Sequence, residues 1–249
     1  MRIMITNDDG INAPGLIRLA ETAKKFGDVT VVAPKDQCSA MSHHITLRED
    51  IAVSEFDFPV EGVKAYAFEG TPADCIRASF LGFIPESEKP DVVFSGINEG
   101  SNCGFDIQYS ATVGAAMEAL LYKVPVICFS QGYVECNLHG GEGVLTEVSD
   151  KYLHDVIDEL LKHELMSNCC WNVNFPNCRL DQYKGMLYDR FPSQQAFWDD
   201  RYETYKGEDG KTYIHMVTEP IKGAEDGSDM KALLGGYISI GFVRNMVLL

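Results

Sequence analysis

The sequence predicts an α/β protein with a mainly parallel sheet and a β-rich C-terminal extension. Short apolar runs alternate with segments of helical periodicity over residues 1–177, which is the pattern of βαβ units. Several of these runs are continuously apolar, as strands covered on both faces are. Beyond residue 177, short alternating segments and Gly-rich turns replace the helices, so we expect hairpins there.

The first βαβ unit is readable residue by residue. Arg2–Thr6 is a short apolar run and the first expected strand. Pro14 begins a helix that ends near Phe26, because proline is tolerated where the backbone N–H has no partner anyway. Val29–Ala33 follows as a β-branched run, typical of a strand buried on both faces.

The next helix begins with a capping pattern. Thr71 is the expected N-cap, Pro72 takes the first turn, and Asp74 completes an arrangement like a capping box. By similar reasoning the remaining helices are expected at Ala111–Tyr122, capped by Ser110, and from Ser149, as a cap, to His163. The remaining strands are expected at Val63–Phe68, Asp91–Phe94, Pro125–Phe129 and Trp171–Asn174. We divide the chain into a core, residues 1–177, and an extension of the same domain, residues 178–249, interpreted as an oligomerisation arm.

Composition excludes several functions. The chain has 21 Lys and Arg against 37 Asp and Glu, a net charge of −16. This argues against nucleic acid and against an anionic membrane as partners. The start of the chain lacks a signal-peptide pattern, and no apolar run is long enough to span a membrane. The eight cysteines form no CxxC pair, so we expect reduced thiols, a cytoplasmic protein and no zinc site.

Adjacent carboxylates follow the first strand. Burying Asp8 and Asp9 unpaired at a strand end costs several kcal/mol, and a divalent cation such as Mg²⁺ or Mn²⁺ removes that cost. The alternative is an exposed Asp-Asp-Gly turn, and spacing alone weighs the two readings about evenly.

Polar residues also follow other strands of the predicted sheet. Ser39 alone would be a turn serine, and Asn98 alone an Asx turn. A role of both residues in a metal site gains support because the carboxyl ends of parallel strands converge on one edge of the sheet, near Asp8 and Asp9. Ser110 and Thr112 begin a helix whose N–H groups offer an anion site, which is compatible with plain capping by Ser110.

Two further features favour a structural interpretation. The pair His43-His44 could suggest a general base, but a histidine pair in a polar loop is more often structural or solvated. An aromatic-rich stretch favours packing or a subunit contact over stacking on a base; it contains Phe191, Phe197, Trp198 and Tyr202.

Together these motifs resemble the SurE family, the survival-protein-E nucleotidases. The resemblance spans nearly the whole chain in the same order. The matching segments are Ile5-Thr6-Asn7-Asp8-Asp9-Gly10-Ile11-Asn12-Ala13-Pro14-Gly15, Ala33-Pro34 with Ser39, Gly70-Thr71-Pro72-Ala73-Asp74-Cys75, Ser95-Gly96-Ile97-Asn98-Glu99-Gly100-Ser101-Asn102, Tyr109-Ser110-Ala111-Thr112-Val113-Gly114-Ala115-Ala116 and, more weakly, Ser228-Asp229 and Gly236-Tyr237-Ile238-Ser239-Ile240.

The resemblance implies a Rossmann-like three-layer fold and a metal-dependent phosphatase. It implies hydrolysis of nucleoside 5′-monophosphates to nucleoside and phosphate by attack of a metal-activated water. Cleavage of 3′-nucleotides and of short polyphosphate is left open. One Mg²⁺ or Mn²⁺ per subunit is implied, and a homodimer or homotetramer built through the C-terminal segment and a β-hairpin. The implied metal ligands are Asp8, Asp9, Ser39 and Asn98, with Asp8, Asp9 and Asn98 catalytic; the implied phosphate-binding residues are Gly96, Asn102, Ser110 and Thr112.

The chain departs from the family at two positions near these residues. Ala40 and Ala111 stand where the family usually has glycine, and each adds a Cβ where a backbone approaches phosphate. A non-catalytic nucleotide-binding or assembly protein therefore stays open as an alternative. Three other classes of protein do not match the sequence. A phosphorelay receiver needs an aspartate where Ser95-Gly96 stands, and a haloacid-dehalogenase-type phosphatase needs Asp-x-Asp after the first strand. A dinucleotide-binding protein needs G-x-G-x-x-G after that strand, and this motif is missing there.

Overall fold

The structure is a computed structural model that describes residues 1–132, 144–164, 166–221 and 223–248. Its main feature is a nine-stranded sheet with the strand order β3-β4-β2-β1-β5-β6-β7-β11-β8. The strands are β1 Arg2–Thr6, β2 Asp28–Pro34, β3 Val53–Glu55, β4 Lys64–Phe68, β5 Val92–Glu99, β6 Val126–Gln131, β7 Cys169–Phe175, β8 Met186–Arg190 and β11 Ile238–Arg244. The six strands from β4 to β7 in this order pair in parallel, while β3 and β11 pair antiparallel with β4 and β7.

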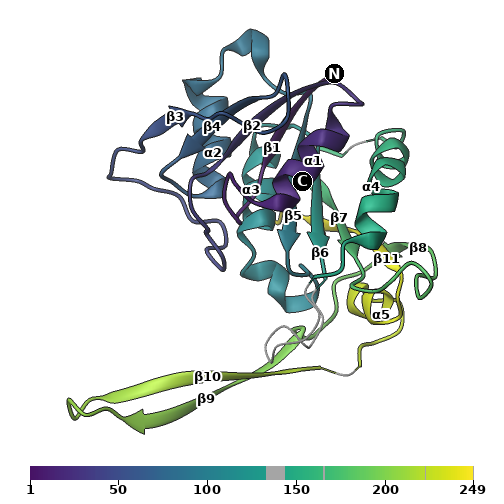
Figure 1. Cartoon of the computed structure of the whole chain (residues 1–249). Helices are drawn as coiled ribbons and strands as arrows, with labels where there is room; N and C mark the ends of the chain where they lie inside the picture. Colours follow the sequence, from purple (N-terminus) through teal and green to yellow (C-terminus); the bar gives the residue numbers. More distant parts are fainter. Residues whose placement is uncertain (133–143, 165, 222, 249) are drawn as a thin grey trace.

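Helices cover both faces of the sheet, so the expected three-layer α/β fold is confirmed (Figure 1). The helices are α1 Pro14–Ala23, α2 Pro72–Ala78, α3 Ala111–Leu121, α4 Glu147–Leu160 and α5 Asp229–Leu234. Short π and 3₁₀ segments are η1 Ser79–Phe83, η2 Glu86–Glu88 and η3 Gly104–Gln108. Successive residues of β1 point to opposite faces, as a strand requires: Ile3 and Ile5 pack with α1 and α4, and Met4 packs with α2 and α3.

The predicted helix starts are confirmed at α2 and α3. Thr71 and Asp74 form a complete capping box, and the Ser110 hydroxyl accepts a hydrogen bond of 3.1 Å from the backbone N–H of Val113. The prediction for α4 was wrong by one turn: its N-cap is Thr146, and Ser149 lies inside the helix with its hydroxyl donating to the Thr146 carbonyl at 3.0 Å. The earlier start leaves Glu147 in the first turn, where a carboxylate interacts favourably with the helix dipole.

The extension beyond residue 177 contributes to two structures. Strands β8 and β11 complete one side of the main sheet. Strands β9 Trp198–Lys206 and β10 Thr212–Pro220 form a separate antiparallel hairpin that stands away from the body of the molecule (Figure 1). The expected hairpin extension is thus present, and the proposed division at residue 177 stays a prediction.

Candidate active site

The polar loops predicted to carry the chemistry meet at one edge of the sheet. In the strand order, β1 lies between β2 and β5. From β1 the chain continues to β2 on one side, and from β5 it continues to β6 on the other, so the direction of the connections reverses between β1 and β5. Such a reversal opens a crevice at the carboxyl ends of the strands, where α/β proteins bind ligands. The loops after β1, β2 and β5 and the start of α3 border this crevice, and hydrogen bonds connect them.

Asp8 is the most buried of the proposed metal ligands, at 4% exposure. Its backbone carbonyl accepts a hydrogen bond of 2.7 Å from the N–H of Cys38, which holds the loop after β2 against the end of β1. Its Oδ1 accepts a hydrogen bond of 2.5 Å from the Thr112 hydroxyl. Burial raises the pKa of Asp8, and hydrogen bonds from the Thr112 side chain and from backbone N–H groups, including those of Thr112 and Ala111, oppose that rise.

Asp9 follows Asp8 in the chain, and burial disfavours the charge of its carboxylate as well. Its Oδ2 accepts a hydrogen bond of 2.9 Å from the backbone N–H of Glu99, at the end of β5. Burial, followed by the charge of Asp8, raises the pKa of Asp9 to about 7. Among the described residues no lysine or arginine forms an ion pair with Asp8 or Asp9. Two unneutralised carboxylates at a buried strand end fit a divalent cation.

Ser39 follows β2 and Asn98 lies near the end of β5, the two strands beside β1, and both side chains carry neutral oxygens. Ser39 is exposed, and its hydroxyl accepts a hydrogen bond of 2.9 Å from Gln37 Nε2. Asn98 follows a register shift in β5, and its Nδ2 donates to the Gly100 carbonyl at 2.7 Å. No cluster of three His, Cys, Asp or Glu side chains within the described ranges is placed to hold a metal. A cation at Asp8 and Asp9 would therefore complete its shell with hydroxyl, amide or water oxygens.

The proposed phosphate-binding residues divide into two groups. Thr112 lies in the first turn of α3 and contacts Asp8, and Ser110 is the N-cap of the same helix. Asn102 belongs to a buried network instead: its Nδ2 donates to Ser130 Oγ and its N–H donates to Asn174 Oδ1, both at 2.8 Å. Within the described residues the Asn102 side chain forms no hydrogen bond with Asp8 or with α3, so its role toward phosphate stays a prediction.

Gly96 is required by close packing of two strands. Its φ is +138°, in the region that favours glycine. A Cβ built at this position would lie 2.2 Å from the Phe129 carbonyl oxygen of β6. Any side chain here would push β5 and β6 apart and displace the segment that ends in Asn98.

A residue that the sequence did not single out holds the Ser39 loop in place. Glu118 of α3 is 2% exposed and accepts hydrogen bonds from Arg77 at 3.1 Å and Tyr122 at 2.9 Å. Its Oε2 also lies 2.8 Å from His43 Nε2. The structural interpretation of His43 is therefore supported. A helical glutamate gives no sequence signal for this role, because most such residues face solvent.

Another anchor of the same loop is Ser42, whose N–H and hydroxyl donate to the carbonyls of Tyr109 and Gln108 at 2.9 and 2.8 Å. Ala40, which stands where the family usually has glycine, lies between Ser39 and Ser42 and has an unusual backbone conformation. Its φ is +58°, so an alanine adopts the left-handed conformation that glycine adopts without strain.

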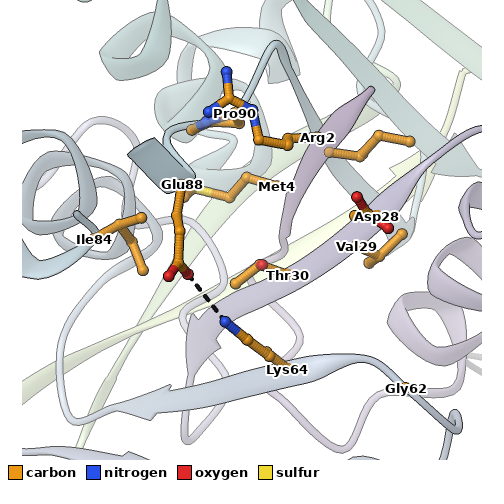
Figure 2. A pocket seen from close by; sticks show the side chains of 11 residues that line it. Arg2, Met4, Asp28, Val29, Thr30, Gly62, Lys64, Ile84, Glu88 and Pro90 are labelled. Carbon is orange, nitrogen blue, oxygen red and sulfur yellow. Dashed lines mark hydrogen bonds and ion pairs between the residues drawn. The ribbon is translucent and has the colours of Figure 1, made fainter. Parts of the chain in front are cut away.

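Cavities lie at both edges of the sheet. One of about 490 Å³ is bordered by Asp9 and Asn98, and continues between α1 and the start of α4. Another of about 300 Å³ lies at the opposite edge, where β1, β2 and β4 begin; Figure 2 shows its lining, with the Lys64–Glu88 ion pair of 3.0 Å. The second cavity is separated from the crevice by the length of the strands, so we place the chemistry at the first edge.

Known proteins resemble this chain over most of its length. The model of the family described as survival protein SurE matches residues 3–197. A 5′-nucleotidase SurE of Clostridium botulinum (strain 657 / Type Ba4) is 35% identical over 240 residues, covering 96% of this chain and 91% of the relative. A 5′-nucleotidase SurE of Aquifex aeolicus (strain VF5) is 35% identical over 238 residues, covering 95% and 89%. The crystal structure of a SurE protein from Aquifex aeolicus superposes with a TM-score of 0.82 at 32% identity, covering 100% of this chain and 95% of that one.

Proposed function

Because this chain belongs to the survival protein SurE family, we propose that it is a divalent-metal-dependent 5′-nucleotidase. It hydrolyses nucleoside 5′-monophosphates to nucleoside and phosphate. The observation that carries the proposal is the pair Asp8 and Asp9, two carboxylates at the switch point of the sheet with no cationic side chain among the described residues to neutralise them.

The proposed metal ligands are Asp8, Asp9, Ser39 and Asn98, and the ion is Mg²⁺ or Mn²⁺, one per subunit. Carboxylate, hydroxyl and amide oxygens are the donor types these ions prefer. A divalent cation bound there supplies neutralisation of phosphoryl charge and a water of lowered pKa. The hydrogen bond from Thr112 to Asp8 supports the site, because it fixes the orientation of one carboxylate before any ligand arrives.

The start of α3 is proposed to bind the phosphoryl group. Ser110 is its N-cap and Thr112 lies in its first turn, where the positive end of the helix dipole favours an anion. We place Gly96 and Asn102 at the same group, as backbone and side-chain donors. These groups would stabilise the charge on the phosphoryl oxygens as the ester bond breaks. Hydrolysis of 3′-nucleotides and short polyphosphate belongs to the same proposal.

The β9–β10 hairpin supports a proposal of homo-oligomerisation. Among the described residues it pairs with no other strand, and it carries large exposed apolar side chains. These are Tyr202, Tyr205, Tyr213, Ile214 and Met216. We propose that this arm joins subunits into a homodimer or homotetramer, since exposed aromatic clusters of this kind mark interfaces. Within the described residues no helix has the length and apolarity needed to cross a bilayer. A cytoplasmic location, without nucleic-acid or membrane partners, completes the proposal.

Phosphate release from nucleoside 5′- and 3′-monophosphates, p-nitrophenyl phosphate and short polyphosphate tests the activity, each assayed with Mn²⁺, Mg²⁺ or EDTA. We expect release from 5′-monophosphates that needs metal and is abolished in Asp8→Asn and Asp9→Asn. The matched control is Asp28→Asn, which removes an exposed carboxylate at the opposite edge of the sheet. No release from folded protein with either metal would favour the non-catalytic nucleotide-binding alternative, and Ala40→Gly and Ala111→Gly would then be the variants to assay.

A further inference from the structure

The loop between β5 and α3 lies between the hairpin arm and the proposed active site. This loop, residues 100–110, contains η3, and residues 193–197, which lead into β9, form the stem of the arm. Asn102 and Ser110, two of the proposed phosphate-binding residues, lie near the two ends of the loop. The arm itself stands away from the body of the molecule (Figure 1). Contacts between the loop and the stem therefore connect the arm with the site.

Close contacts join the stem to this loop. The N–H of Phe105 donates to the Gln195 carbonyl, and the N–H of Phe197 donates to Asp106 Oδ2, both at 3.0 Å. A Cβ built at Gly104 would lie 2.1 Å from the Gln195 carbonyl oxygen, so the two backbones leave no room for a side chain there. A small buried apolar cluster also draws residues from both segments. The start of the arm is thus fixed to the loop by backbone, side-chain and apolar contacts.

A second carboxylate, at the start of α5, holds the same two segments together. Asp229 is 4% exposed, and its Oδ2 accepts a hydrogen bond of 3.0 Å from the N–H of Gly104. Its Oδ1 accepts hydrogen bonds from the N–H groups of Ser193 at 2.9 Å and Met230 at 2.7 Å. Burial raises the pKa of both Asp106 and Asp229, and the hydrogen bonds from backbone N–H groups oppose that rise. Two acidic side chains are therefore used to join backbone segments rather than to face solvent.

The other side of the loop supports the proposed site. The Asp106 carbonyl accepts a hydrogen bond of 3.1 Å from the N–H of Ser110, the cap of α3. The carbonyls of Gln108 and Tyr109 accept from the hydroxyl and the N–H of Ser42, which anchors the loop after β2. Asp106 therefore contacts the stem of the arm through its side chain and the start of α3 through its backbone.

We propose that Asp106 is a positioning residue: its carboxylate fixes the stem of the arm to the loop, so that a second copy of the chain bound at the arm holds the start of α3 in place for the phosphoryl group. The inference rests on the proposed function, which places that group at Ser110 and Thr112. Asp106 acts through the backbone of the loop and does not touch the substrate. Subunit assembly and phosphate binding are thereby linked.

The test compares two substitutions of Asp106 with one matched control. Asp106→Ala removes the acceptor of the Phe197 N–H, while Asp106→Asn keeps an oxygen acceptor and the size of the side chain. The control is Glu225→Ala, because Glu225 holds the stem at Ser193 and Gln194 and forms no hydrogen bond with the loop among the described residues. Each protein is assayed at saturating Mn²⁺ for kcat and KM on a nucleoside 5′-monophosphate and on p-nitrophenyl phosphate.

Asp106→Ala should raise KM for both substrates and Kd for inorganic phosphate about tenfold, because the phosphoryl group is common to all three ligands. Asp106→Asn and Glu225→Ala should stay within about twofold of the wild type. Titration calorimetry of phosphate into the metal-loaded protein gives Kd without turnover. Wild-type KM and Kd in folded Asp106→Ala overturn the inference, even if its unfolding temperature falls, because the contact is then structural only. An equal loss of affinity in Glu225→Ala overturns it as well.

The role of the arm is tested by a second change. A short Gly-Ser linker replaces residues 199–219 and leaves the stem, because Trp198 and Pro220 are register partners at the base of the hairpin. This truncation should raise Kd for phosphate as Asp106→Ala does, and the two changes together should raise it no further than either alone. Losses that multiply would mean that the arm and Asp106 act independently, and they overturn the inference. If Asp106→Ala does not fold, a wild-type Kd in the truncated protein overturns it.

The same measurements separate this inference from the proposed function. If the wild type hydrolyses nucleotides while Asp106→Ala and the truncation leave Kd and KM unchanged, the nucleotidase proposal stands and the inference fails. If the wild type binds phosphate in a way that needs Asp106 and the arm, but hydrolyses no ester with Mn²⁺ or Mg²⁺, the proposed function fails and the link between arm and anion site stands.

Discussion

The hydroxyl of Thr112 donates a hydrogen bond of 2.5 Å to Asp8 Oδ1, which ties the first turn of α3 to the loop that follows β1. Both residues are almost completely buried, at 0% and 4% exposure. The contact joins a proposed phosphate-binding residue to a proposed metal ligand. A change at Thr112 should therefore act on metal binding as well as on catalysis.

The first prediction concerns this contact. Thr112→Val should lower metal-dependent phosphate release about ten- to a hundredfold, because a hydrogen bond to a charged group contributes about 1.5–3 kcal/mol. Thr112→Ser keeps the hydroxyl and should stay close to the wild type. Initial rates over a range of Mn²⁺ concentrations measure both effects, with thermal unfolding as the check on folding. A wild-type rate and Mn²⁺ dependence in Thr112→Val would show that the contact is structural only.

A second prediction concerns the carboxylate pair. Mn²⁺ should raise the midpoint of thermal unfolding of the wild type, since a ligand in hundredfold excess over its Kd stabilises the native state by about 2.7 kcal/mol. Asp9→Asn should lose most of this stabilisation. In EDTA at pH 8 the same variant should unfold at a higher temperature than the wild type, because it removes the repulsion between Asp8 and Asp9.

The control for that experiment is Asp28→Asn, which should respond to Mn²⁺ as the wild type does. Differential scanning fluorimetry of the three proteins, with metal and with EDTA, is sufficient. A wild type whose midpoint is indifferent to both Mn²⁺ and Mg²⁺ would remove the support for a metal site at Asp8 and Asp9.

Glu118 gives a prediction about pH. Burial raises its pKa, but hydrogen bonds from His43, Tyr122 and Arg77 outweigh burial, so its pKa lies below the ordinary value. A carboxylate with a lowered folded-state pKa contributes stability above its unfolded pKa, about 4.3, and that contribution is lost as the pH falls toward the folded value. Glu118→Gln should lower the free energy of unfolding by about 1–3 kcal/mol at pH 7. The free energy of unfolding of this variant should also fall less steeply than that of the wild type as the pH is lowered.

Urea unfolding of wild type and Glu118→Gln at pH 7 and at steps below pH 5 measures this difference. The gap between the two proteins should narrow as the pH falls. A gap that stays constant down to acid unfolding would show that the carboxylate charge of Glu118 is not what stabilises the fold. Because His43 belongs to the Ser39 loop, we also expect Glu118→Gln to raise the Mn²⁺ concentration needed for half-maximal activity.

The sequence predicted those parts of the fold that depend on neighbours in the chain. The capping box of Thr71 and Asp74 and the cap at Ser110 are local hydrogen-bond patterns, and both are present. The extension of β5 to Glu99 was not predicted, because it needs Gly96 packed on β6 and a register shift before Asn98. The pairing of β8 with β11 likewise joins segments about fifty residues apart, which no periodicity encodes.

The same distinction applies to the site. Asp8 and Asp9 are adjacent in sequence, so their repulsion is visible in the sequence itself. The contacts of Glu118 with His43 and Arg77 join distant segments and exist only in the folded chain. Thr112 was predicted as a phosphate ligand, and the structure adds a hydrogen bond to Asp8 that sequence spacing could not suggest.

A further prediction concerns the hairpin. Trp198 and Pro220 are register partners at its base, so a short Gly-Ser linker can replace residues 199–219 without stretching the chain. The truncated protein should fold, because within the part of the chain that the structure describes β9 and β10 pair only with each other. It should form smaller oligomers than the full chain. Light scattering measures the mass, and the circular dichroism spectrum checks the fold. An unchanged oligomer would exclude the hairpin as the subunit contact.

The last prediction concerns Ala40, whose left-handed backbone lies next to the proposed ligand Ser39. An alanine in this conformation costs roughly 1–2 kcal/mol, while a glycine adds chain entropy to the unfolded state, so Ala40→Gly should raise the free energy of unfolding by about 0.5–1 kcal/mol. Ala111→Gly is the contrasting variant, since Ala111 begins α3 with ordinary helical geometry and glycine there should destabilise. Urea unfolding of both variants separates the two cases. A loss of stability in Ala40→Gly would mean that other contacts of the loop compensate for the strain at this residue.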